Sequence, residues 1–254
     1  MLRFYRHIRK TLMEKQKMKS YVFYAIGEIF LVVIGILIAL QVNNWNEYRK
    51  ERNLETRYLQ RLAADLEKDI ESFSISYDAN EGRKKRTEFL LEAVDASELV
   101  NKEPTYFIES IEYAGYTYDP VISDHIFEEI KSSGRLAIIQ NEELRTALST
   151  YYSTLSNRDQ YNFIRQEFQI DYLKFSRGIL SPEQQIAVGS FSRSETYTQD
   201  EAQEAYRRMM AKPYFLEILP ITIQSKTRTS EVLNNFKNEA VVLQEMIINQ
   251  LNEL

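Results

Sequence analysis

The chain has 254 residues with only 7 glycines and 5 prolines, well below the roughly 12 % that these residues make up in a typical protein, and it has no cysteine. The lack of cysteine excludes disulfides, thiolate metal sites and cysteine nucleophiles. The net charge of −5 is unevenly divided, because residues 1–20 hold seven basic residues and one acidic residue whereas residues 62–254 carry −12. Since nucleic-acid binding depends on neutralising phosphates, this acidic body argues against a nucleic-acid partner.

Residues 1–20 form a basic N-terminal segment in which apolar residues recur at helical spacing. We expect a short amphipathic helix on the cytoplasmic leaflet of a membrane, attracted by anionic lipid. A solvated basic tail is the alternative interpretation.

An apolar stretch follows from Tyr21 to Val42, with Glu28 as its single ionisable residue and twelve consecutive apolar residues from Ile29 to Leu40. As a helix these 22 residues would measure about 33 Å, enough to cross a hydrocarbon core of about 30 Å. The run is too long for the apolar region of a secretory signal peptide, and no small-residue cleavage site follows it. The sequence therefore predicts an uncleaved transmembrane helix.

The flanks of this stretch indicate its boundaries and orientation. Tyr21 and Tyr24 at one end and Trp45 at the other are typical of aromatic anchors at membrane interfaces. Seven basic residues precede the stretch and five follow it within residues 43–61, which favours a cytoplasmic N-terminus. The predicted domains are a basic cytoplasmic segment, 1–20, a transmembrane helix, 21–45, and a helical, periplasmic extramembrane domain, 46–254.

Long stretches without glycine or proline predict long helices, at residues 36–81, 135–177 and 221–254. Apolar residues recur in them at steps of three and four: Leu59, Leu62, Leu66, Ile70, Phe73 and Tyr77; Leu144, Leu148, Tyr151 and Leu155, then Tyr161, Ile164, Phe168, Tyr172 and Phe175; Val232, Phe236, Ala240, Leu243, Ile247 and Leu251. Each stripe needs a partner surface. We predict an all-α fold in which the transmembrane helix continues into a long helix and is followed by an extramembrane helical bundle.

Local signals mark several helix ends. Gly134 is expected to end one helix in the left-handed conformation, and Asn141, Ser181 and Thr198 are expected to cap the starts of three others. Connections between helices are expected near residues 78–84, 101–105, 115–122, 178–198 and 212–220.

Glu28 is the leading candidate for a functional residue, because a carboxylate in lipid is costly unless it faces protein or water. It shares a helical stripe of small and polar residues: Ala25, Glu28, Val32, Gly35, Ala39, Val42 and Asn46. Gly35 and Ala39 form a small-xxx-small pair that permits close helix packing, so we expect self-association. The predicted intramembrane polar and oligomerisation residues are Gly27, Glu28, Gly35, Ala39 and Gln41.

Two roles remain open for Glu28. A ring of Glu28 side chains in an oligomer could line a polar path for cations or protons. Alternatively, these side chains form a hydrogen-bonded cluster that stabilises the oligomer, or reach the cytoplasmic interface. No motif for catalysis, phosphate binding or metal binding occurs elsewhere, so we expect no enzymatic activity, no catalytic residue, no metal and no cofactor.

Two segments of the chain carry a family resemblance. Tyr24–Ile29, Leu31–Gln41 and Asn43–Glu47 resemble the N-terminal signature of an uncharacterised family of Bacteroidetes membrane proteins, domain of unknown function 6090. A second segment, from Ser132–Leu136 to Tyr151-Tyr152, is similar to another hallmark of that family. The resemblance implies a bacterial envelope protein with one N-terminal span and a helical body, and it implies no activity or site residue.

These observations together predict a single-span inner-membrane protein whose transmembrane helix forms homo-oligomers. We expect it to act as a scaffold or receptor, with the lipid bilayer and a possible envelope protein as partners. The alternative function is an oligomeric ion channel, or an ion-coupled membrane component, that uses Glu28.

Overall fold

The computed structural model describes residues 18–157, 159–189 and 196–253, without the side chains of residues 18–21 and 159–163. These residues form helices and contain no strand, which confirms the all-α prediction for this part of the chain. The elements in chain order are α2 (Met18–Asp95), α3 (Glu98–Lys102), α4 (Pro104–Tyr113), α5 (His125–Ser132), the 3-10 helix η1 (Leu136–Ile138), α6 (Glu142–Ser156), α7 (Asp159–Phe175), α8 (Pro182–Val188), α9 (Gln199–Met210) and α10 (Pro213–Glu253).

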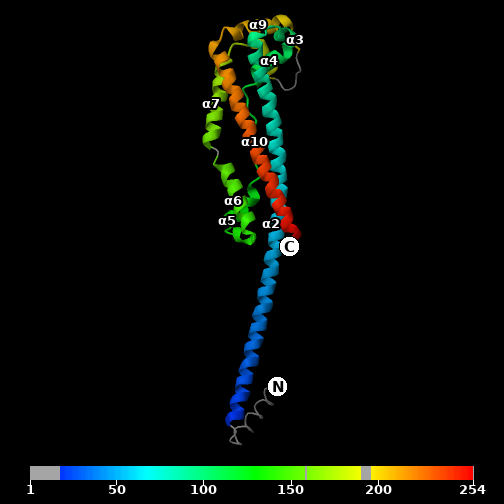
Figure 1. The fold of residues 1–254 in the computed structure, drawn as a ribbon, viewed down its shortest axis with the longest axis vertical. Coiled ribbons are helices and arrows are strands. Elements are labelled where there is room, and N and C mark those ends of the chain that lie inside the picture. The colour runs from blue at the N-terminus through cyan, green and yellow to red at the C-terminus, as the bar shows by residue number, and fades with distance from the viewer. Residues whose placement is uncertain (1–17, 158, 190–195, 254) are drawn as a thin grey trace. The chain divides into compact units, whose positions relative to one another are not determined.

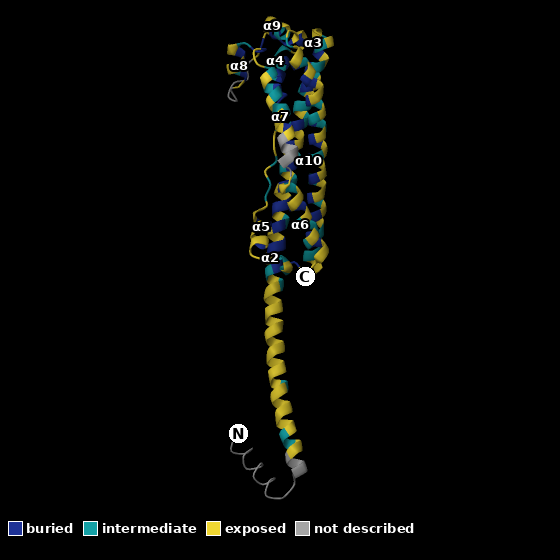
Figure 2. Cartoon of the chain, turned by 90° about the vertical axis from the view of Figure 1, so that its left-hand side faces the viewer, coloured by how far each residue is buried: buried dark blue, intermediate teal, exposed yellow. Residues whose placement is uncertain are grey.

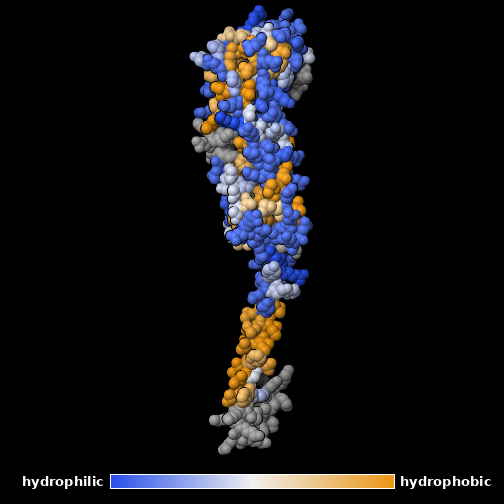
Figure 3. All heavy atoms as spheres, in the orientation of Figure 1, coloured by the Kyte–Doolittle hydropathy of each residue, from blue (hydrophilic) through white to orange (hydrophobic). Residues whose placement is uncertain are grey.

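The chain divides into two compact units, residues 1–56 and residues 57–254. In the first unit, α2 is long and apolar enough to cross a membrane, and none of its most apolar 18-residue window is buried. Most of its large apolar side chains are exposed, from 44 % at Val33 to 75 % at Phe23, and Ile34 is half-buried. Figure 3 shows them as a continuous hydrophobic surface. Residues 1–17 of the predicted amphipathic segment, 1–20, and the side chains of residues 18–21 lie outside the described part of the chain.

The second unit is a helical bundle. Residues 57–95 of α2 lie antiparallel to α10, while α6 and α7 follow one another along α10 (Figure 1). The α2–α10 contact is direct, because Asn80 Nδ2 donates to Lys226 O and to Ser230 Oγ, each at 2.8 Å. The rings of Phe73 and Phe236 stack at 5.9 Å in the same seam. Figure 2 shows that the buried residues are concentrated in this unit.

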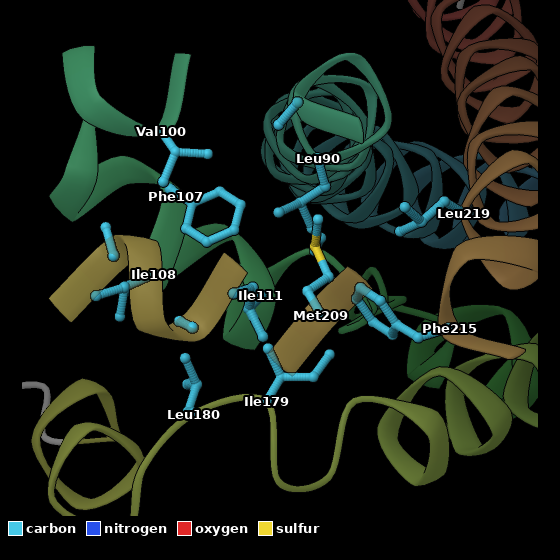
Figure 4. Close-up of a cluster of buried hydrophobic side chains, with 14 of the residues drawn as sticks. Leu90, Val100, Phe107, Ile108, Ile111, Ile179, Leu180, Met209, Phe215 and Leu219 are labelled. Atoms are coloured by element: carbon cyan, nitrogen blue, oxygen red, sulfur yellow. The ribbon is translucent and has the colours of Figure 1, made fainter. Parts of the chain in front are cut away.

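Four short helices close one end of the bundle. Helix α9 packs against α3 and α4, and α4 also packs against α8. Their apolar residues form a continuous core with the neighbouring ends of α2 and α10 (Figure 4). The residues labelled there are Leu90, Val100, Phe107, Ile108, Ile111, Ile179, Leu180, Met209, Phe215 and Leu219.

The predicted apolar stripes identify the apolar seams of the long helices but not the core that α3, α4, α8 and α9 form with the ends of α2 and α10. Of the stripe residues, the structure buries Leu59, Leu62, Leu66, Phe73, Leu144, Leu148, Tyr151, Tyr172, Phe236, Ala240, Leu243 and Ile247. Ile164 was wrongly placed in a stripe, because it is 45 % exposed. Tyr77 was wrongly placed in the stripe, because it is 36 % exposed while Ser76 and Asn80 are buried. Asn80 can be buried in the bundle because its side chain donates two hydrogen bonds to α10.

One predicted connection is wrong and another is shorter than predicted. Helix α2 passes through residues 78–84, including Gly82. The connection predicted near 212–220 is confined to residues 211–212, because α10 begins at Pro213 and continues through Pro220. Gly82 costs an exposed helix only about 1 kcal/mol, and the packing of α2 against its neighbours outweighs this. Pro220 removes one backbone hydrogen bond, but Leu219 beside it is fully buried, so packing outweighs the loss.

The predicted caps are confirmed. Gly134 follows α5 with φ of 69°, and the backbone bonds Arg135 N–Ile130 O and Gly134 N–Lys131 O, both 3.0 Å, complete a Schellman motif. Asn141 Oδ1 accepts from Leu144 N at 3.1 Å at the start of α6. Capping boxes at Ser181 and Thr198 begin α8 and α9, with Pro182 in the first turn of α8.

Candidate functional site

The predicted intramembrane residues all lie on the exposed surface of α2 in the first unit: Gly27, Glu28, Gly35, Ala39 and Gln41. A Cβ added at Gly27 or at Gly35 would meet no described atom within 4 Å. Nothing in the described chain therefore requires glycine at these positions, and the space beside them is available to another molecule. No described residue forms an ion pair with Glu28 within 4 Å.

Helix geometry separates this set into two faces. At about 100° per residue, Gly35 and Ala39 fall within about 20° of Glu28 around the helix axis. Gly27 lies about 100° and Gln41 about 140° away from Glu28, both in the same direction. Helix α2 therefore aligns Glu28, Gly35 and Ala39 on one face and places Gly27 and Gln41 on a neighbouring one. Of the predicted interface anchors, Tyr24 is half-buried and Trp45 is 61 % exposed.

The body contains a buried acidic cluster at the contact of α2, α6 and the segment before α5. The fully buried Asp69 accepts hydrogen bonds from Ser123 N at 2.7 Å and from the Tyr151 hydroxyl at 3.0 Å. Burial raises the pKa of Asp69, and Asp65 and Asp124 add to this effect, while the two hydrogen bonds oppose it. Burial also raises the pKa of Tyr151, which stays a hydrogen-bond donor. The cluster fastens the segment before α5 to the bundle.

A buried basic cluster lies farther along the bundle, between α2, α7 and α10. Lys226 is 4 % exposed and Arg165 is 7 % exposed. The ammonium of Lys226 donates to Tyr116 O, and the guanidinium of Arg165 pairs with Asp119, whose side chain is 57 % exposed. On α2, Arg83 lies with its Cζ 5.9 Å from the ring centre of Tyr118, and its buried Nη1 has no hydrogen-bond partner among the described residues.

The basic cluster changes the titration of its members. The pKa of Lys226 is lowered to about 7, mainly by burial and in addition by the positive charges of Arg83 and Arg165, while Asp119 opposes the shift. Burial also lowers the pKa of Arg83. The basic cluster therefore carries a net positive charge in the buried interior of the bundle.

A small cavity adjoins these cations. Its walls include Arg165 and Gln169 from α7 and Thr222, Ser225, Lys226 and Thr229 from α10. The free space within it is about 10 Å³, close to what a single water molecule requires. Elsewhere, the described residues contain no group of three or more histidine, aspartate or glutamate side chains that could hold a metal ion.

The sequence analysis did not identify these two clusters, although a signal for each was present. Extending the α10 stripe backwards from Phe236 through Leu233 and Thr229 reaches Lys226, which places a charge at an interior position. In α2, Asp69 lies four residues before the buried Phe73 in the same way. What could not be predicted are their partners, because Tyr116, Tyr151 and Arg165 are distant in the sequence.

Comparison with known proteins places the chain in a family without assigning a chemistry. The chain matches a family of unknown function, DUF6090, over residues 28–181. This match includes Glu28, Gly35, Asp69 and Arg165 and ends before Lys226. No curated protein and no solved structure matches the chain. Because the match covers more than half of its residues, the chain belongs to the DUF6090 family.

Proposed function

We propose that this chain is a single-span protein of a bacterial inner membrane that assembles into homo-oligomers and acts as a scaffold or receptor. One observation carries the proposal: α2 exposes an apolar run long enough to span a bilayer, and one face of that run bears Glu28, Gly35 and Ala39. The proposal assigns the chain no enzymatic activity.

Packing in lipid gives this face its role. Transmembrane helices gain no hydrophobic free energy from one another, so they associate through close backbone contact and interhelical hydrogen bonds. Gly35 and Ala39 allow such contact, and the open space beside Gly35 leaves room for a partner helix. Glu28 on the same face gains a partner when copies assemble, which removes the cost of an isolated carboxylate in lipid.

The proposed orientation places the N-terminus in the cytoplasm and residues 46–254 in the periplasm. The excess of basic residues before the span supports it. The acidic helical bundle would then meet envelope proteins or ligands outside the cytoplasm, with the bilayer and other copies of the chain as its remaining partners.

A leucine in place of Gly35 tests the association. We expect Gly35→Leu to lower the oligomer mass measured by native mass spectrometry from lipid nanodiscs, because the larger side chain separates the backbones. Val33→Leu is the matched control, since Val33 lies about 140° from Glu28 around the helix and the change also adds bulk. A Gly35→Leu variant that assembles like the wild type contradicts the proposal.

An oligomeric ion channel is the competing function, supported by a carboxylate that lies on the exposed surface of the apolar run. Glu28→Gln removes its charge with little change of shape. If Glu28 only packs, the variant changes assembly without lowering cation or proton flux into proteoliposomes. Unchanged assembly with lost flux supports the channel, whereas unchanged assembly with unchanged flux excludes it.

A further inference from the structure

The ammonium of Lys226 is buried without a counter-ion. Its hydrogen bond goes to a neutral acceptor, the carbonyl of Tyr116, and no carboxylate of the described residues pairs with it within 4 Å. An unpaired buried charge is destabilising by several kcal/mol, so a protein either neutralises the group or supplies an opposite charge.

The neighbouring charges do not balance it. Arg83 and Arg165 both act on Lys226, and the single carboxylate that acts on it, Asp119, is already paired with Arg165 and more than half exposed. Water screens an exposed carboxylate far more than a buried cation, so Asp119 compensates only part of the charge. The space between α7 and α10 therefore holds more positive than negative charge.

The cavity beside Lys226 has the size and the donors for a small anion. Its space is close to that of one water molecule, which excludes carboxylic acids, phosphate and sulfate. Ser225 and the amide nitrogen of Gln169 contribute neutral donors, because neither group forms a hydrogen bond with the described residues. Thr222 donates its hydroxyl hydrogen to Ile218 O on its own helix at 2.9 Å.

We propose that this cavity binds one monoatomic anion of the size of chloride, held by Lys226 and Arg165 with neutral donors from Ser225 and Gln169. The bound ion supplies the missing charge and joins α7 to α10. Through Lys226 it also supports the backbone at Tyr116, which belongs to the segment between α4 and α5. The inference concerns the body alone and does not depend on the membrane assembly proposed above.

Thermal unfolding of the full chain in detergent micelles tests the site. The midpoint is measured at about pH 6.5, where most Lys226 is protonated, in sodium chloride and in sodium gluconate of equal ionic strength. We expect the wild type to gain stability from chloride in a saturable way, because only the folded protein holds the ion. Gluconate is too large for the cavity and screens surface charges equally.

Two variants assign the effect to the cavity. Lys226→Met removes the buried ammonium and is expected to abolish the difference between the two salts, whatever its own stability. Arg228→Met, on the same helix with an exposed side chain, removes one positive charge elsewhere and is expected to keep the difference. Equal midpoints of the wild type in both salts overturn the proposal. Equal salt effects in all three proteins also overturn it.

Direct detection of the ion provides a second test that does not depend on stability. Chloride-35 NMR of the wild type should show excess line broadening that bromide reverses, because a bound halide relaxes quickly and exchanges with the solvent. The Lys226→Met variant should lack this broadening, and Arg228→Met should show it. Broadening of the same size in all three proteins contradicts a site at Lys226.

Discussion

At the scale of single residues, Gly115 is required by a close approach. A Cβ at this position would lie 2.1 Å from Cδ1 of Tyr172. Tyr172 cannot retreat, because it is fully buried, donates to Ile111 O at 3.1 Å and packs edge-on against Phe215. Overpacking of this kind typically costs about 1–3 kcal/mol.

We therefore expect Gly115→Ala to lower the free energy of unfolding by about 1–3 kcal/mol in urea denaturation. Gly82→Ala is the matched control, because a Cβ there meets no described atom within 4 Å and Gly82 lies inside α2. This control should raise stability by up to about 1 kcal/mol. Similar effects of the two substitutions would contradict the packing argument.

Lys226 also makes stability depend on pH. Its pKa is about 7 in the folded chain and about 10.5 when unfolded, so between these values the unfolded state binds the additional proton. Stability from this group therefore increases as pH rises through the window and decreases as pH falls towards 7. The charged groups that act on Lys226 are Arg83 from α2, Arg165 from α7 and Asp119 from the segment between α4 and α5.

In gluconate buffer, the free energy of unfolding of the wild type should rise relative to Lys226→Met by up to about 1.4 kcal/mol per pH unit between about pH 7.5 and pH 9.5. Urea denaturation of both proteins at several pH values measures the difference. The contributions of all other titrating groups cancel in it, because both proteins contain them. Parallel pH profiles of the two proteins would show that the pKa of Lys226 is not lowered.

At the scale of elements, side-chain caps decide where the helices begin. Asn141 caps α6 by accepting from Leu144 N, and such caps contribute about 1 kcal/mol. We expect Asn141→Ala to lower the free energy of unfolding, measured by urea denaturation, by this amount. Asn141→Asp keeps an acceptor oxygen at the helix start, so this variant should retain most of the stability that Asn141→Ala loses. Equal losses in both variants would assign the effect to the exposed contact of Asn141 with Gln250 instead.

Some helix boundaries are determined by residues close in the sequence, and others by packing against other helices. The ends at Gly134, Asn141, Ser181 and Thr198 were predicted correctly because each is decided by a side chain or backbone conformation within a few residues. The expected breaks at Gly82 and Pro220 were wrong, because burial of their neighbours against other helices outweighs a modest local cost. Periodicity predicted the apolar seams of the long helices for the same local reason, but it did not predict the core of the short helices or the polar residues that are buried in the bundle.

At the scale of the whole molecule, the lack of cysteine allows the proposed orientation to be tested with single thiols. Ser97, between α2 and α3, is exposed and its side chain caps no helix. We expect Ser97→Cys to react with a membrane-impermeant maleimide in intact spheroplasts. Thr11→Cys, before the apolar run, should react only after lysis. The reverse pattern would invert the proposed topology.

The sequence by itself determined the helical class, the apolar helix with its Glu28, Gly35 and Ala39 face, the helix caps and the apolar seams of the long helices. These features depend on composition, on spacing along one helix and on contacts within a few residues. Only the tertiary structure revealed the acidic cluster at Asp69 and the cation cluster at Lys226. Their partners are far apart in the sequence, 82 residues for Asp69 and Tyr151 and 110 residues for Lys226 and Tyr116. The order of residues along the chain does not show which side chains meet when the helices pack.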